Sequence, residues 1–215
     1  MSLSADHLIA KWYNPPQTDS VVEHHFALHD AIWVLYAGRH LDPAYIEATE
    51  ILCHQQIKIS ELAAIEYRKL LHGQGLPVHL GYQSLAIFEG NRGNHTEAIR
   101  LYAEAMQHGW RGEWAHWISR EHFSTAQDHQ NADDFAEATK LAEMALFCGW
   151  EGAWLTLLTD CCAKLARRRE QARDLVGAVE LADMALALGL SGKWVERLTR
   201  YRRQLATSSI QMEIR

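Results

Sequence analysis

A six-residue cassette occurs three times at a fixed interval in the second half of the chain. The copies are GWRGEW from Gly109, GWEGAW from Gly149 and GLSGKW from Gly189, so each step is 40 residues. A fixed period of roughly 20 to 50 residues is the signature of a solenoid, in which each unit buries its apolar face against its neighbours. The sequence therefore predicts stacked, nearly equivalent units.

Each cassette follows a segment in which apolar residues recur at helical spacing, which predicts helices over 96–106, 138–146 and 178–186. Asn94, with Glu97 three residues later, resembles a capping pair at the start of the first of them. The glycine that opens each cassette suits the left-handed residue just past a helix end. Small side chains at two fixed positions would let a partner helix approach closely; they are Ala98, Ala138 and Ala178, and Ala105, Ala145 and Ala185.

A second helix is expected before each of these three. The spacing places these helices near 77–90, 113–128 and 153–170. A last helix over 192–206 has no partner after it, as expected for a terminal cap. The predicted fold is all-α: antiparallel helix hairpins of about 40 residues, stacked as a solenoid and closed by a capping helix.

The residues 79–112 resemble the tetratricopeptide repeat. The stretch Leu85-Ala86-x-Phe88, the run Glu97-Ala98-Ile99 and the later Tyr102 and Ala105 follow that family's order of large, small and aromatic positions, and Gly93 falls at its inter-helix turn. The likeness extends more loosely to 119–152 and 159–192. It implies stacked helix hairpins whose first helices line a concave groove that binds a peptide.

The chain departs from the pattern of that family at three points. Its unit is 40 residues, whereas the family's unit is about 34. A Gly-Trp pair stands where the family commonly has proline, and the turn glycine is replaced by Asp133 and then by Arg173.

The first 75 residues are less regular. Asp42-Pro43 is a strong helix start, with the aspartate as cap and the proline in the first turn. Helices are expected near 4–12, 19–38, 43–57 and 61–72. The predicted organisation is 1–75 as irregular helices continuous with the solenoid, 76–206 as the repeats and capping helix, and 207–215 as a tail.

Composition limits the class of protein. The formal charge is −6, yet residues 151–215 carry 11 Lys and Arg against 8 Asp and Glu. The overall sign argues against a dedicated nucleic-acid binder, which is usually basic throughout. No secretory signal or membrane-length apolar run is evident, and the cysteines lack paired spacing, so we expect reduced thiols and a cytoplasmic protein.

Basic residues cluster on two helices at the carboxy-terminal end, and they form the best candidate site. If the first helices of successive hairpins share a groove, their guanidinium groups would face an acidic peptide or a phosphate, since they bind carboxylates bidentately. The alternative is a solvated helix face, paired with Glu170 and Glu196. The predicted partner-binding residues are Lys164, Arg167, Arg200 and Arg203.

The histidines of the sequence EHHFALHD offer a metal alternative. His25 and His29 are four residues apart, so both lie on one side of a helix, a spacing that can hold a metal. A zinc site needs further ligands, which no motif supplies. The competing interpretation is a core-facing stripe that His29 shares with Val22, Phe26, Trp33 and Tyr36.

Two further motifs allow both a functional and a structural interpretation. Arg111 and His116 match the loose Arg-x4-His spacing of a class of helical ribonucleases and could stabilise and transfer protons at a scissile phosphate. The cassette tryptophans could form aromatic pockets or close the junctions between hairpins. Leu190 replaces Trp in the last copy and preserves burial but not aromatic recognition, which favours packing.

These observations predict a non-enzymatic helical-repeat adaptor that binds a protein or peptide partner, with no catalytic residue, metal site or cofactor. Self-association is compatible with this prediction. The alternatives are a helical ribonuclease or metal-dependent enzyme and a nucleic-acid-binding module.

Overall fold

The computed structural model describes residues 20–150, 152–190 and 192–213, and these residues form ten α-helices, α2 to α11. The predicted all-α class is confirmed for this part of the chain, where the only β-type pairing is an isolated bridge between Val78 and Arg111. The predicted helix near 4–12 lies outside the described residues. Contacts divide the chain into two compact units, Met1–Glu121 and His122–Arg215.

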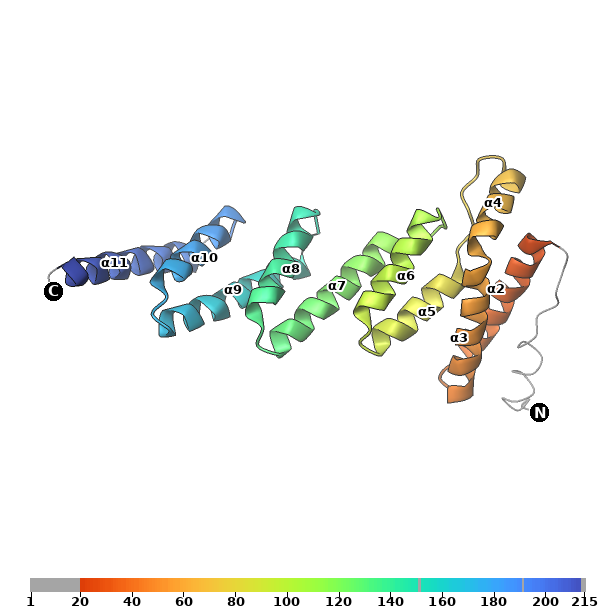
Figure 1. Ribbon diagram of the computed structural model, residues 1–215, viewed down its shortest axis with the longest axis horizontal. Coiled ribbons are helices and arrows are strands. Elements are labelled where there is room, and N and C mark those ends of the chain that lie inside the picture. The colour runs from red at the N-terminus through yellow and green to blue at the C-terminus, as the bar shows by residue number, and fades with distance from the viewer. Residues whose placement is uncertain (1–19, 151, 191, 214–215) are drawn as a thin grey trace. The chain divides into compact units, whose positions relative to one another are not determined.

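From residue 20 onward, the first unit contains five complete helices and the start of α7, Trp114–Asn131. Its helix α2 packs on α3, α4 and α5, and α5 and α6 form an antiparallel hairpin (Figure 1). The bounds of these five helices are Val21–Ala37 for α2, Pro43–Lys58 for α3, Ser60–Leu71 for α4, Leu80–Asn91 for α5 and His95–Gln107 for α6.

Local chemistry explains where these helices begin. The Asp42 carboxylate accepts a hydrogen bond of 2.9 Å from the Ala44 backbone N–H, and Pro43 occupies the first turn, as predicted.

The fully buried Gln56 joins three helices, because its amide donates to the His25 carbonyl at 3.1 Å and accepts from the Gly81 N–H at 2.7 Å. These bonds tie α2, α3 and α5 into one core.

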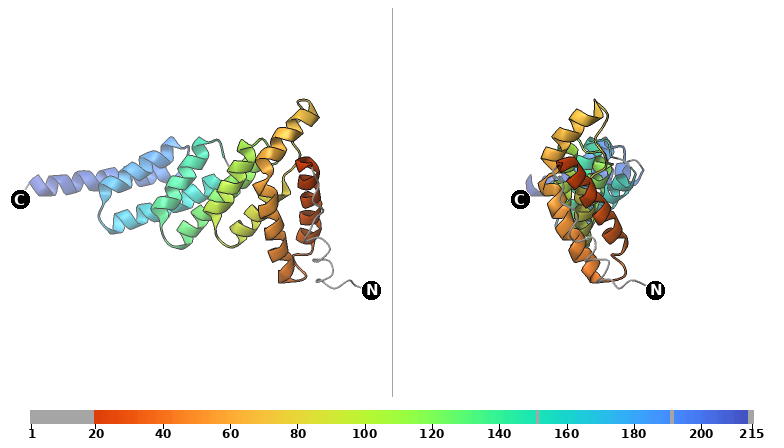
Figure 2. Two further views of the ribbon diagram at one scale, coloured as in Figure 1. Left: turned by 45° about the vertical axis from the view of Figure 1, so that its right-hand side comes forward. Right: turned by 90° about the vertical axis from the view of Figure 1, so that its right-hand side faces the viewer.

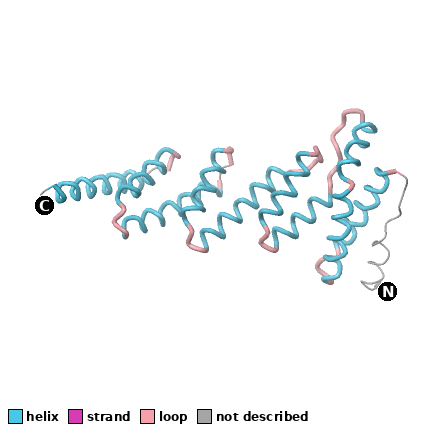
Figure 3. The backbone as a smooth tube through the Cα atoms, in the orientation of Figure 1, coloured by secondary structure: helices cyan, strands magenta, loops and turns pink. Residues whose placement is uncertain are grey.

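The second unit repeats one packing step. Helix α8 packs on α9, α9 on α10, and α10 on α11, with short loops between them (Figures 2 and 3). Its core consists mainly of the small and branched side chains of the predicted helix faces, including Ala138, Ala145, Ala178 and Ala185. The bounds are Phe135–Phe147 for α8, Ala153–Gln171 for α9, Leu175–Ala187 for α10 and Lys193–Glu213 for α11.

The cassettes are helix ends followed by buried indoles. Gly109, Gly149 and Gly189 have φ of 79°, 81° and 81°, the left-handed conformation expected just past a helix end. Trp114 and Trp154 are each only 4% exposed. This burial favours the packing interpretation of the cassettes; Trp110, Leu190 and Trp194 are also buried, and Trp150 is half-buried.

The inter-helix turn keeps one backbone conformation although its residue changes. Gly93 has φ of 81°, and its replacements Asp133 and Arg173 have φ of 63° and 60°. Two residues with a Cβ atom thus adopt the left-handed conformation that glycine adopts without strain. The backbone geometry of the turn is retained in all three copies.

Two expectations about α2 and α6 were wrong. The buried face of α2 does not contain Phe26 and Trp33, which are 59% and 66% exposed. The face toward α3 and α5 instead includes His25 and Leu28, because the helix is rotated by about one residue (100°) from the expected register. The second error concerns capping. The Asn94 side chain makes no cap bond and donates instead to Glu89 at 2.7 Å.

Helix α11 continues to Glu213, past the expected end near residue 206. The sequence between them contains no Gly or Pro, so no residue terminates the helix.

Candidate functional site

Basic side chains from two helices of the second unit converge on one hollow of about 210 Å³. Three arginines and one carboxylate line it, so it carries an excess of positive charge. We call it the arginine hollow; its lining residues are Ala163, Arg167 and Glu170 of α9 and Arg197, Arg200 and Tyr201 of α11.

The acid of the arginine hollow neutralises only one of its three guanidinium groups. Arg200 pairs with Glu170 at 2.9 Å, and the Tyr201 hydroxyl lies 3.4 Å from the same carboxylate oxygen. Within the described part of the chain, Arg167 and Arg197 form no ion pair. Two cationic groups therefore face the hollow without an acidic neighbour of their own.

Aromatic rings hold two of these arginines in place. The Arg197 guanidinium lies 4.8 Å from the centre of the buried Trp194 ring, and that of Arg200 lies 5.1 Å from the Tyr201 ring. Stacking on a ring leaves the N–H edges of a guanidinium available to a planar anion. The cassette residue Trp194 thus packs against one of the arginines of the hollow.

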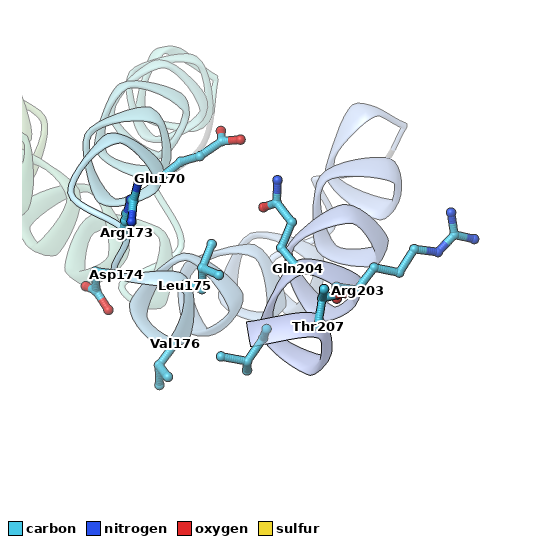
Figure 4. A pocket seen from close by; sticks show the side chains of 9 residues that line it. Glu170, Arg173, Asp174, Leu175, Val176, Arg203, Gln204 and Thr207 are labelled. Atoms are coloured by element: carbon cyan, nitrogen blue, oxygen red, sulfur yellow. The ribbon is translucent and has the colours of Figure 1, made fainter. Parts of the chain in front are cut away.

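The other predicted site residues lie outside the arginine hollow. Arg203 shares a second depression with Arg200, one turn along α11. It also lines a larger hollow of about 740 Å³, where its guanidinium points away from Glu170 and Arg173 (Figure 4). Lys164 of α9 points toward α8, with its ammonium 5.0 Å from the centre of the Phe135 ring. The structure thus brings Arg167 and Arg200 together and leaves Lys164 and Arg203 beside them.

Arg197 was not among the predicted site residues. Its membership depends on the packing of α9 against α10 and of α10 against α11, which brings residues 30 positions apart into contact, as in the pair of Glu170 with Arg200. One sequence signal was available, because Arg197 lies three residues before Arg200 and so shares its helix face.

The histidine pair of α2 lies in a different environment. His25 is 2% exposed and stacks on Trp110 with the ring centres 4.9 Å apart. Burial, with help from the charges of His29 and His24, lowers the pKa of His25 to about 4. Burial also lowers the pKa of His29. Among the residues that the structure describes, no three His, Cys, Asp or Glu side chains group in a way that could hold a metal ion.

The two residues of the ribonuclease-like pair belong to different elements, since Arg111 lies in the cassette turn and His116 lies in α7. The Arg111 backbone N–H donates to the Pro77 carbonyl at 3.2 Å and its side chain is exposed. His116 is also exposed, and its ring lies edge-on to Trp117 with the centres 5.8 Å apart. The role of Arg111 that the structure displays is a backbone bond that fixes the loop before α5.

Comparison of the chain with protein-family models, with curated proteins and with solved structures finds no match. None of the helices described combines the length and apolar character needed to cross a bilayer.

Proposed function

We propose that this protein is a non-enzymatic adaptor that binds an acidic segment of a protein partner through the arginine hollow. The single observation that carries the proposal is the convergence of Arg167, Arg197 and Arg200 on one hollow that contains one carboxylate. Guanidinium groups with free N–H edges select carboxylates, and a partner carboxylate can also compete with Glu170 for Arg200.

A more specific proposal for the fold is consistent with this function. We propose that the hairpins form a solenoid of the tetratricopeptide kind, with units of about 40 residues. The left-handed turns at Gly93, Asp133 and Arg173 and the buried cassette tryptophans support it. Both helices that supply the arginines are first helices in this scheme, and first helices line the groove. A cytoplasmic location fits the free cysteines, three of which are buried.

A binding measurement with a defined probe tests the proposal. The probe is a fluorescein-labelled peptide rich in Asp and Glu, and its counterpart carries Asn and Gln at the same positions. Wild-type protein should bind the acidic peptide, and the affinity should fall as salt screens the charges. The variant Arg167→Gln/Arg197→Gln/Arg200→Gln should lose this binding, as followed by fluorescence anisotropy.

Arg202 provides a matched control on the same helix. It already pairs with Asp183 at 3.0 Å, so Arg202→Gln removes one basic side chain without changing the arginine hollow. It should bind the acidic peptide like the wild type. Equal loss in both variants, or equal binding of the acidic and amide peptides, would contradict the proposal.

A pull-down from native extract extends the test to the natural partner. Wild-type protein and Arg202→Gln should retain a common protein that the triple variant loses, as identified by mass spectrometry. If ribonuclease or deoxyribonuclease treatment abolishes the retention instead, the basic surface binds nucleic acid and the adaptor proposal fails.

A further inference from the structure

A second surface of the same unit has the opposite character. An apolar groove of about 670 Å³ lies between the carboxy-terminal ends of α8 and α10. We call it the α8/α10 groove. The residues on which the argument depends are Glu143, Met144, Phe147 and Cys148 from the α8 end and Met184 and Leu188 from the α10 end.

The apolar side chains of this groove are unusually accessible. Phe147 is 94% exposed and Met144 is 57% exposed. Methionine is unbranched and polarizable, so methionine-lined surfaces adapt to the shape of a partner. Exposed apolar patches of this kind mark interaction sites in soluble proteins.

The charge of the groove is negative from two independent sources. Glu143 is its acidic lining residue, and the Oε1 atom of this side chain is buried without a hydrogen-bond partner in the described structure. The last turns of both α8 and α10 contain no basic residue. The carboxy-terminal end of a helix carries a partial negative charge, so two such ends reinforce the carboxylate.

The next repeat shows what Glu143 lacks. Forty residues later the equivalent acid, Asp183, pairs with Arg202 at 3.0 Å. The residue equivalent to Arg202 in the earlier copy is Cys162, a buried thiol whose pKa is raised to about 12 by burial and by the Glu143 charge. Asp183 thus has an arginine partner, whereas the equivalent position opposite Glu143 is a cysteine.

An α-helix satisfies the requirements for an occupant better than an extended segment does. Apart from the last carbonyls of α8 and α10, the helices that line the groove bond their backbone groups internally, so an extended strand would lose water from most of its N–H and C=O groups without gaining partners. A helix keeps these groups bonded and presents a stripe of apolar side chains.

We propose that the α8/α10 groove binds an amphipathic helix of a partner protein, whose apolar stripe packs on Met144 and Phe147 and whose adjacent Lys or Arg pairs with Glu143. This binding surface is separate from the arginine hollow and recognises a partner of the opposite charge.

Two stapled helical peptides test the charge preference. Both carry the same leucine stripe; one is flanked by lysines and the other by glutamates. The full-length protein should bind the lysine peptide at least about tenfold more tightly, and Glu143→Lys should reduce or reverse that preference. The control Glu180→Lys makes the same charge change at an exposed position of α10 outside the groove and should keep the preference.

Two further measurements locate the binding. Phe147→Ser should lower the affinity for the lysine peptide about tenfold. Val195→Ser, at a 53% exposed position of α11, should not weaken it. Cys148 is exposed while Cys53, Cys161 and Cys162 are buried, so N-ethylmaleimide should modify it selectively, and bound lysine peptide should slow that modification.

Three outcomes would overturn the proposal. The first is a lysine preference that survives in Glu143→Lys while circular dichroism shows the variant folded. The second is an unchanged rate of Cys148 modification with peptide bound. The third is a peptide-free dimer, seen by analytical ultracentrifugation, that Phe147→Ser converts to monomer; the occupant would then be a second copy of this chain.

Discussion

Three ring nitrogens in the core of the first unit lie without a hydrogen-bond partner among the described residues: Nε2 of His25, Nε2 of His79 and Nε1 of Trp110. The His79 ring stands edge-on to both others, with centres 4.8 Å from His25 and 4.7 Å from Trp110. A neutral imidazole is tolerated in such a site, whereas an imidazolium loses its hydration and gains no counter-charge.

The first unit should therefore lose stability on mild acidification. Burial holds the pKa of His25 at about 4, and burial with the charge of His25 holds that of His79 well below its usual value. Below about pH 6.5 these histidines bind protons in the unfolded chain but remain neutral in the folded chain. Their contribution to the free energy of unfolding is therefore fully present above that pH and is lost as the pH falls toward 4. His25 alone should cost about 2 kcal/mol between pH 7.5 and pH 5, measured by urea unfolding at each pH.

The substitution His25→Phe isolates this effect. Phenylalanine keeps a ring stacked on Trp110 and cannot be protonated, so the variant should show a smaller loss over the same pH range. His116 is exposed, and His116→Phe should leave the loss unchanged. An identical pH dependence in the wild type and His25→Phe would show that the buried ring does not set it.

Burial, and not residue type, should decide the effect of removing an indole. Trp114 is 4% exposed, and its Nε1 donates to the Trp110 carbonyl at 2.7 Å, whereas Trp33 is 66% exposed. Trp114→Ala should lower the free energy of unfolding by about 3–5 kcal/mol. Trp33→Ala should lower it by less than about 1 kcal/mol. Urea unfolding followed by far-UV circular dichroism measures both; similar losses would contradict this assignment of the core.

At the level of the element, the inter-helix turns of the second unit carry local backbone strain. Asp133 and Arg173 adopt the left-handed conformation, which is costly for a residue with a Cβ atom. Asp133 recovers part of this cost, since its backbone carbonyl accepts from Arg168 at 2.7 Å and its carboxylate pairs with the same side chain at 3.3 Å. The side chain of Arg173 forms no ion pair in the described structure.

Arg173→Gly should therefore stabilise the second unit by about 0.5–1 kcal/mol, because relief of strain exceeds the added freedom of the unfolded chain. Asp133→Gly should give no gain, because it removes the ion pair with Arg168. Thermal unfolding of the two variants beside the wild type makes the comparison. A larger gain from Asp133→Gly than from Arg173→Gly would contradict this account.

Helix positions could be predicted from the sequence because their signals are local. The cap at Asp42-Pro43 and the glycines at 109, 149 and 189 act through neighbouring residues, and the structure confirms them. The orientation of α2 could not be predicted in this way. Its apolar residues form more than one stripe, and only packing against α3, α4 and α5 selects the one that contains His25 and Leu28.

The candidate sites depend on contacts between elements. The sequence placed Arg167 and Arg200 together through the expected hairpin stack, but the stacking of Lys164 on Phe135 and the outward direction of Arg203 depend on individual side-chain packing. The α8/α10 groove was not predicted at all. The sequence offered one signal for it: Phe147 stands at the end of an expected helix, four residues after Glu143, and the position 40 residues before Arg202 is occupied by Cys162.

At the scale of the whole molecule, each unit has its own apolar core, and both proposed binding surfaces lie in the second. The arginine hollow belongs to α9 and α11, and the apolar groove to α8 and α10. Alternate helices of one unit thus present surfaces of opposite charge. One partner segment cannot satisfy both, so the two proposals can fail or succeed separately.

The equivalence of Glu143 and Asp183 in successive repeats also predicts that the second unit can be shortened by one period. Deleting residues 149–188 removes one whole period and joins α8 to the loop before α11, so that Glu143 takes the place of Asp183 opposite Arg202. We expect this shortened chain to fold cooperatively by circular dichroism and thermal unfolding, and a deletion of residues 149–168, half a period, to fail. The Glu143 carboxylate, whose Oε1 atom has no hydrogen-bond partner in the described structure, would then form an ion pair inside a protein that is one repeat shorter.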